Sequence, residues 1–356
     1  MMKTLIFQYL SDKCKAWLNL LFLQALSENM KELVQNFPVQ LRQALEIGEN
    51  AKLRKHSAQI QNVLITGLGG SGIGGSILSE IVSSECPVPV CVNKDYFMPG
   101  FVGQHTLVIV SSYSGNTEET LYALDEAIRR KAKIVCITSG GKVAELAVSH
   151  DLDIIIIPGG MPPRSCLGYS LTQLFYVMSF FDLTGDNFRT QIASAIRLLE
   201  QEGNEIKNEA KQITDFLSGK IPVIYCVDGF GGVATRFRQQ INENSKMLCW
   251  HHVLPEMNHN ELVGWAENHP DCAVVILRNE TDYSRTQARI EISKEVFNRY
   301  SSGVKEIWSK GKSTLERSLY LIHLTDWVSC YLADKKNVDA NEINIINHLK
   351  GELSKI

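Results

Sequence analysis

The sequence has no C-x-x-C pair, although it contains nine cysteines. Cysteine pairs with that spacing are typical of zinc ribbons and redox-active disulfides, and an odd number of cysteines does not fit a closed disulfide framework. Several of the cysteines lie in or beside apolar runs of the kind that form buried strands. We therefore expect reduced thiols, no metal site and a cytoplasmic protein.

The sequence also lacks a large excess of charge and a long hydrophobic run. A net charge of −3 gives no general attraction to nucleic acid or to an anionic membrane. The apolar run at 16–26 has some character of a signal-peptide core, but Asp12 and Asn19 weaken it and no clean cleavage site follows. That run is also too short to span a bilayer. We interpret residues 1–29 as an N-terminal extension and expect no membrane partner.

A repeated alternation of strands and helices begins at residue 62, in a chain long enough for two domains. Short continuous apolar runs separated by helical patterns indicate parallel strands that are buried on both faces. This pattern predicts a doubly wound α/β domain. The expected strands are 63–66, 88–92, 107–111, 134–138 and 154–157, and the expected helices are 73–83 and 121–130.

A second run of the same kind follows a helical region at 166–218, which breaks at 185–187. A strand at 222–227, a glycine turn at 229–232 and a helix at 233–247 repeat the opening of the first half. Strands at 273–277 and 304–308 and a helical ending of about 40 residues complete it. We interpret the chain as a duplicated α/β unit, whose ligands bind beyond the carboxyl ends of the strands. The expected domains are 30–185 and 219–356, joined by a connecting helix at 186–218.

The first glycine loop, Gly67–Gly72, is ambiguous. It fits the G-x-G-x-x-G pattern of dinucleotide-binding domains, which also require an acidic residue at the end of the second strand. Asn93 occupies that strand tip and Asp95 lies two residues beyond it. A nicotinamide-dependent dehydrogenase therefore stays open at this point, and the alternative is close packing of strand and helix that only glycine permits.

The second loop, 112–120, favours a phosphate site. Ser112, Ser114 and Thr117 offer three hydroxyls where a helix begins, and the N-terminus of a helix attracts anions. A helix end carries only about half a unit of charge, so a phosphate dianion needs such additional donors. The spacing of Asn116 and Glu119 also fits a capping box, but a capping box does not explain the serines.

This loop, together with Gly69-Gly70-Ser71, resembles the sugar isomerase (SIS) domain, and the chain more narrowly resembles the bifunctional phosphoglucose/phosphomannose isomerase family. The resemblance extends over roughly residues 30–356. It implies two flavodoxin-like SIS domains with doubly wound parallel sheets and flanking helices, without a cofactor. Further segments that carry it, in family order, are 162–164, Gly168-Tyr169, 240–246, 255–261 with Gly264-Trp265, and Leu349-Lys350.

The resemblance implies a metal-independent isomerase that interconverts glucose 6-phosphate, mannose 6-phosphate or both with fructose 6-phosphate through a cis-enediol. Glu243 is then the base that moves the proton. Periodicity alone, with Val233, Phe237 and Ile241 on one apolar stripe, would favour a solvated face on which Glu243 pairs with Arg236. The residues implied for phosphate binding are Gly70, Ser71, Ser112, Ser114 and Thr117.

Three more residues receive roles from the resemblance, although each would otherwise be interpreted as an ordinary surface residue. His259 opens the sugar ring and reaches the active site of a neighbouring subunit, which implies a homodimer with shared active sites. Arg164, stiffened by two prolines, stabilises the enediolate, and Lys350 assists at the ring oxygen. Asp339-Ala340 replaces an aspartate–proline pair of the family. A threonine that some members place near this point, linked to handling both epimers, is not evident in residues 339–342, which puts use of both epimers in doubt. The alternative is a non-catalytic SIS-type regulator that binds a sugar phosphate.

Overall fold

The computed structural model of the chain describes residues 29–55 and 58–356. The chain divides into two compact units. Unit 1 contains residues 40–75 and 85–184 together with the segment that ends at Leu33, and unit 2 contains 34–39, 76–84 and 185–356. The predicted N-terminal extension, except Asn29, lies outside the described residues. The segment predicted to connect the domains, 186–218, belongs to unit 2.

The sheet of unit 1 is parallel throughout, and its strands follow the order β2-β1-β3-β4-β5. This order is the flavodoxin-like one. The central strand β3 is buried along its whole length, as expected for a sheet covered on both faces. The strands are β1 (Asn62–Thr66), β2 (Val90–Asn93), β3 (Thr106–Ser112), β4 (Lys133–Thr138) and β5 (Asp153–Ile156).

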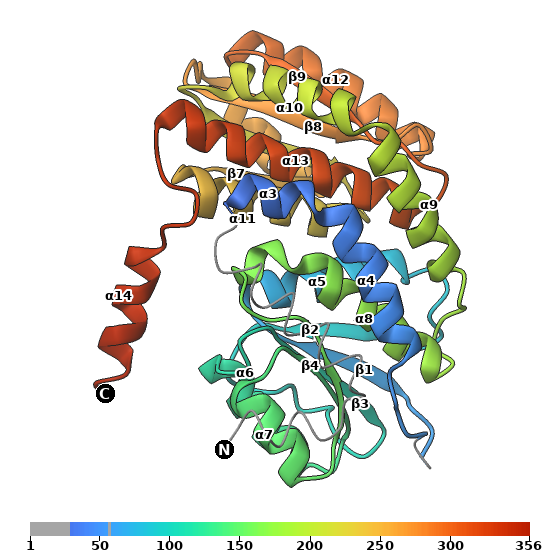
Figure 1. Ribbon diagram of the computed structural model, residues 1–356. Coiled ribbons are helices and arrows are strands. Elements are labelled where there is room, and N and C mark those ends of the chain that lie inside the picture. Colours follow the sequence, from blue (N-terminus) through green and yellow to red (C-terminus); the bar gives the residue numbers. More distant parts are fainter. Residues whose placement is uncertain (1–28, 56–57) are drawn as a thin grey trace. The chain divides into compact units, whose positions relative to one another are not determined.

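Helices cover both faces of this sheet (Figure 1). α6 (Glu118–Arg129) and α7 (Gly141–Ser149) lie on one face, and α5 (Gly69–Ile81) and α8 (Leu167–Phe180) lie on the other. The two faces follow from right-handed crossovers, because the chain moves along the sheet in opposite directions from β1 to β2 and from β3 to β5. The preceding helices α3 (Met30–Gln35) and α4 (Phe37–Glu49) complete the N-terminal half.

The sheet of unit 2 repeats the arrangement of the first. Its four parallel strands have the order β7-β6-β8-β9, which matches β2-β1-β3-β4 of unit 1. The predicted α/β class and the doubly wound parallel sheets are therefore confirmed. The strands are β6 (Ile221–Val227), β7 (Trp250–Leu254), β8 (Cys272–Arg278) and β9 (Val304–Trp308).

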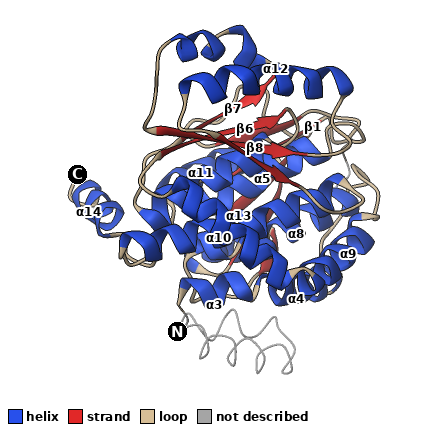
Figure 2. Ribbon diagram, turned by 90° about the horizontal axis from the view of Figure 1, so that it is seen from above, coloured by secondary structure: helices blue, strands red, loops and turns tan. Residues whose placement is uncertain are grey.

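Unit 2 also has helices on both faces of its sheet. α12 (Ser284–Tyr300) covers one face, and Figure 2 shows α10, α11 and α13 on the other. α13 is buried along most of its length, because it packs against α9, α10 and α11. The helices on that face are α9 (Phe188–Gln201), α10 (Gly203–Leu217), α11 (Gly231–Ser245) and α13 (Thr314–Lys336).

Several predicted boundaries differ from the structure. The helical region at 166–218 breaks a second time, at Glu202, and the helical ending is interrupted at 337–343 before α14 (Asn344–Leu353). The strand β7 and the helices α3, α4, α7 and α12 were not predicted. In the part of the chain that the structure describes, none of the helices combines the length and the hydropathy needed to cross a membrane.

Candidate functional site

The first glycine loop of unit 1 brings strand and helix into close contact. A Cβ atom on Gly72 would lie 2.2 Å from the carbonyl oxygen of Gly67. A Cβ atom on Gly67 would lie 2.4 Å from the carbonyl oxygen of Ser111. Real Cβ atoms do not approach other atoms so closely, so these two glycines serve packing between β1, β3 and the start of α5.

The same loop also contacts two other segments, at Pro163 and at Tyr113. A Cβ atom on Gly70 would lie 2.9 Å from the main chain of Pro163, so only glycine lets the segment that carries Arg164 lie this close. The hydroxyl of Ser71 accepts a hydrogen bond from the amide of Tyr113 at 2.9 Å, which joins the loop to the start of the second loop. Ser71 is therefore bonded to the hydroxyl-rich loop, and the segment that carries Arg164 lies against the neighbouring Gly70.

Arg164 is buried, with an exposed fraction of 3%. It lies in the short 3-10 helix η1 (Pro163–Ser165), directly before α8. The interpretation of Arg164 as a surface arginine is therefore wrong. A buried guanidinium in a polar loop is a group that proteins keep for binding anions or for pairing with carboxylates.

The second loop has a shape that depends on Gly115. Its φ is 67°, and a Cβ atom there would lie 1.8 Å from the carbonyl oxygen of Gly140. Around this turn the Ser112 hydroxyl donates to the Thr117 hydroxyl at 3.4 Å, and the Ser114 hydroxyl accepts from the amide of Asn116 at 3.2 Å. The three predicted hydroxyl residues therefore belong to one turn that leads into α6.

The start of α6 is not capped as the sequence suggested. α6 begins at Glu118, and its N-cap residue Thr117 makes no side-chain capping bond within the described chain. The side chain of Asn116 instead accepts from the amide of Lys142 at 3.1 Å and donates to the carbonyl oxygen of Ser114 at 3.1 Å. The predicted capping box is therefore not formed, and Asn116 anchors the loop to the start of α7.

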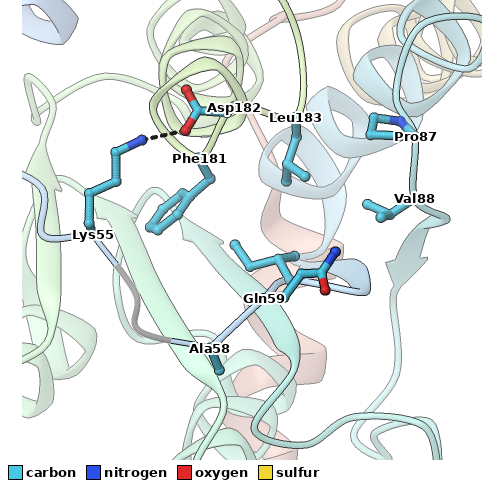
Figure 3. Close-up of a pocket in the computed structure, with 9 residues that line it drawn as sticks. Lys55, Ala58, Gln59, Pro87, Val88, Phe181, Asp182 and Leu183 are labelled. Atoms are coloured by element: carbon cyan, nitrogen blue, oxygen red, sulfur yellow. Dashed lines mark hydrogen bonds and ion pairs between the residues drawn. The ribbon is translucent and has the colours of Figure 1, made fainter.

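A cavity of about 410 Å³ lies elsewhere in unit 1, and Figure 3 shows its lining. Gln59 and Ile60 line it just before β1, and Pro87 and Val88 just before β2. It therefore lies at the amino ends of the strands, whereas the hydroxyl-rich loop follows the carboxyl end of β3. The ammonium of Lys55, which also lines it, pairs with Asp182 at 2.7 Å. This cavity is separate from the predicted phosphate loop.

The glycine turn of unit 2 is already occupied by a carboxylate of the chain itself. Both carboxylate oxygens of Glu80 accept from the amide of Gly232, at 2.8 and 2.9 Å. Gly232 lies in the first turn of α11, where a helix attracts negative charge. Glu80 therefore holds the position that an anionic ligand would take, and the sequence gives no local signal for this pairing across 152 residues.

Glu243 lies in the last turn of α11 and is half-buried. The apolar stripe of Val233, Phe237 and Ile241 is buried, as predicted. The expected solvated face is wrong, because Arg236 is only 2% exposed and its guanidinium donates to the carboxylate of Asp326 at 2.6 Å.

This buried ion pair joins α11 to α13. Burial raises the pKa of Asp326, and the attraction of Arg236 opposes that rise. Two residues near Glu243 make further contacts with α13: the Asn244 side chain donates to the Ser329 hydroxyl at 2.9 Å, and the Ser245 hydroxyl donates to the Ser329 carbonyl at 2.7 Å. The helix that carries Glu243 is therefore held by polar contacts on its buried side.

Glu243 and His259 lie at opposite ends of the strands of the unit 2 sheet, Glu243 toward the amino ends and His259 at the carboxyl ends. α11 runs from the carboxyl end of β6 to the amino end of the parallel strand β7. Glu243 is twelve residues beyond Gly231, which places it about 18 Å along the helix axis from the carboxyl edge. His259 is exposed and ends the 3-10 helix η2 (Glu256–His259), which follows the carboxyl end of β7. Within a single chain, the sheet of unit 2 therefore does not bring the side chains of Glu243 and His259 together.

Lys350 lies in α14, where every residue is exposed. The segment that leads to this helix starts near Glu243, because the ammonium of Lys246 donates to the carbonyl oxygens of both Glu243 and Asp339, at 2.7 and 2.8 Å. The segment that leads to Lys350 therefore passes the end of α11 that carries Glu243.

Comparison with known sequences gives one consistent family. A bifunctional phosphoglucose/phosphomannose isomerase from Caldicellulosiruptor bescii is 41% identical over 337 residues, which cover 92% of this chain and 99% of that protein. A protein of the same name from Aquifex aeolicus is 37% identical over 85% of this chain and 93% of its own length. The profile described as bacterial phospho-glucose isomerase C-terminal SIS domain matches residues 206–353.

Solved structures agree with this at the level of the fold. A hypothetical protein from Thermus thermophilus superposes with a TM-score of 0.73 at 16% identity, over 96% of this chain and 94% of that one. The C-terminal domain of glucosamine-fructose-6-phosphate aminotransferase from Francisella tularensis gives 0.71 at 14% identity, over 88% and 97% of the two chains. The names of the curated relatives favour the isomerase over the dehydrogenase and the non-catalytic regulator. The chain therefore belongs to the bifunctional phosphoglucose/phosphomannose isomerase family and is a phosphohexose isomerase.

Proposed function

We propose that this enzyme interconverts glucose 6-phosphate, mannose 6-phosphate or both with fructose 6-phosphate through a cis-enediol, without a metal ion, and that Glu243 is the base. The observation that carries the proposal is the turn of unit 1 in which Ser112, Ser114 and Thr117 lead into α6. Hydroxyls and helix amides in such a turn can surround a phosphate dianion. The compartment that we propose is the cytoplasm.

In this proposal the phosphate fixes the sugar and the other residues act on its first two carbons. Gly70 and Ser71 complete the phosphate site, since Ser71 is bonded to the second loop. Arg164 stabilises the enediolate, and two observations support this role: its main chain lies against Gly70 and its side chain is buried. Charge placed in advance where negative charge develops is the most effective form of such stabilisation.

The proton transfers balance within the substrate and the side chains. Glu243 removes the proton from C2 of the open-chain aldose, which leaves an enediolate with its negative charge on O1. A proton passes from the hydroxyl at C2 to O1, and Glu243 returns its proton to C1 to give the ketose. Neutral His259 gives a proton to O5 as the ring opens and takes one from the hydroxyl at C1. Lys350 assists at the ring oxygen.

The position of His259 supports a shared active site in a homodimer. Glu243 and His259 of one chain lie at opposite ends of the strands of the unit 2 sheet. We therefore propose that His259 acts in the active site of the partner subunit. Closed, two-fold dimers are the commonest soluble assemblies, and each would then contain two equivalent sites.

The first test is Glu243→Gln, which keeps the size of the side chain and removes its basicity. We expect isomerisation to fall by a factor of about 10²–10⁴ or more, while fructose 6-phosphate binds with nearly unchanged affinity. Glucose 6-phosphate and mannose 6-phosphate are offered separately in a coupled assay, and binding is measured by calorimetry. Retained turnover would reject Glu243 as the base.

The second test decides whether His259 acts across the dimer. The variants Glu243→Gln and His259→Asn are inactive alone, and they are co-expressed with different tags so that mixed dimers form. With a shared site, each mixed dimer has one intact site, and random pairing restores about a quarter of the wild-type activity. If the co-expressed variants stay as inactive as either one alone, His259 acts within its own chain.

A further inference from the structure

Lys246 makes the direct connection between the main chain at Glu243 and the segment that leads to Lys350. It follows α11 as its C-cap residue in the left-handed conformation, with φ 53° and ψ 44°. Its ammonium donates to the carbonyl oxygen of Glu243 at 2.7 Å and to that of Asp339 at 2.8 Å. One side chain thus joins the end of α11 to the stretch 337–343, which lies between α13 and α14.

The bond to Glu243 has a clear physical basis. The last four carbonyl groups of a helix have no partner within the helix, and the carbonyl of Glu243 is one of them. A cation at this end also complements the negative end of the helix dipole. A bond to the main chain of Glu243 restricts the last turn of α11 and therefore the direction in which the carboxylate leaves the helix.

The bond to Asp339 serves a different segment. The stretch 337–343 has no regular secondary structure, and α14 after it is exposed along its length. Few contacts therefore fix where α14 begins. Asp339 precedes Lys350 by eleven residues, so a bond that holds Asp339 beside α11 restricts the region that Lys350 can reach.

We propose that Lys246 is a positioning residue for isomerisation, which aligns the carboxylate of Glu243 with the helix that carries Lys350. The inference rests on the proposed roles of these two residues. Lys246 acts through the main chain of its partners and takes no part in proton transfer. Glu243 is the base, and Lys246 holds Glu243 in the position from which it acts on the substrate.

The structure offers a matched control. The ammonium of Lys336, at the end of α13, donates to the carbonyl oxygen of Lys246 at 2.9 Å. Lys336 lies at the same helix end and also bonds to main chain, but its bond to Lys246 reaches neither Glu243 nor Asp339. Lys336→Met therefore removes a comparable bond without removing the connection.

The experiment compares Lys246→Met, Lys246→Arg and Lys336→Met. We expect Lys246→Met to lower kcat about tenfold or more with KM for fructose 6-phosphate changed less than about twofold, because alignment matters in the transition state and not in phosphate binding. Arginine has donors for both carbonyl groups, so Lys246→Arg recovers most of kcat. Lys336→Met stays within about twofold of the wild type.

Hydrogen exchange supplies a readout that does not depend on turnover. In Lys246→Met we expect faster exchange of the amides of 339–343, with the interior of α11 and α13 unchanged. Unchanged exchange in this segment, or an unchanged kcat, overturns the proposal. A raised KM with unchanged kcat overturns it as well, because the lysine then serves binding.

These outcomes differ from failure of the proposed function. If Glu243→Gln stays active, the base assignment is wrong, and the exchange measurement still decides whether Lys246 holds the segment. If Glu243→Gln is inactive and Lys246→Met matches the wild type, only the positioning role is wrong.

Discussion

One buried histidine makes a contribution to the stability of unit 2 that is lost as the pH falls. His323 lies in α13 and is 3% exposed. Its ring stacks on Phe37, with centroids 5.8 Å apart, and meets the edge of Trp327 at 6.3 Å. Burial lowers the pKa of His323 to about 3, and the charge of Lys207 adds to that effect. The imidazole therefore stays neutral in the folded protein.

The sign and size of the effect follow from the difference in pKa. In the unfolded chain a histidine titrates near pH 6.5, so below that pH the unfolded state binds a proton that the folded state does not. The stability that the neutral ring contributes is complete above pH 6.5 and is lost as the pH falls toward 3. Between pH 7 and pH 5 this difference amounts to about 2 kcal/mol.

Other buried groups act in the opposite direction over this range. Burial raises the pKa of Asp326, Asp282 and Glu209, so the folded state binds protons at these sites more readily than the unfolded state. Their contribution to stability increases as the pH falls. The wild-type pH profile alone is therefore insufficient, and a comparison with a variant that lacks only the imidazole isolates His323.

His323→Phe provides that comparison, because it keeps a flat ring against Phe37. Urea unfolding, followed by a probe in unit 2, gives the free energy of unfolding at pH 7 and pH 5 for both proteins. We expect the wild type to lose about 2 kcal/mol more than the variant over this interval, whatever their difference at pH 7. Equal losses in the two proteins would refute the assignment of a neutral, buried His323.

Three further predictions concern the phosphate loop and the ligand. Gly115→Ala places a Cβ atom 1.8 Å from the carbonyl oxygen of Gly140, so we expect KM to rise about tenfold or more in steady-state assays. Gly100→Ala is the control: its Cβ atom has open space around it, and KM stays unchanged. Calorimetry gives one bound fructose 6-phosphate per chain, since Glu80 already fills the turn of unit 2; two equivalents would contradict that role. Activity survives dialysis against EDTA, whereas a loss that added metal restores would show that the reaction depends on a metal ion.

The sequence predicted the parts of the fold that local pattern determines. Buried parallel strands such as β3 and β8 are continuous apolar runs, so their positions were predicted to within a few residues. β7 was missed because it opens with Trp250, His251 and His252 and its early residues remain partly exposed. A short strand at the edge of a sheet does not need the apolar run that identifies a central strand.

The site was predicted less completely, because its support comes from distant parts of the chain. The hydroxyl-rich turn could be located from the residues of one loop. The roles of Arg236 and Glu80 could not, since Arg236 pairs with Asp326 90 residues away and Glu80 bonds Gly232 152 residues away. Helical periodicity assigned Arg236 to solvent because it describes one helix and does not include α13, which covers that side.

The placement of a carboxylate on the glycine turn of unit 2 distinguishes two halves whose sheets share the order of four strands. An ancestral duplication would have given both halves an equivalent place for an anion, and Glu80 turns one of them into a permanent internal contact. With this place filled by its own chain, the second half would be left to present Glu243, the proposed base, at the far end of α11. A substitution of Glu80 by glutamine would therefore be informative for reconstructing how a symmetric ancestor became an asymmetric enzyme.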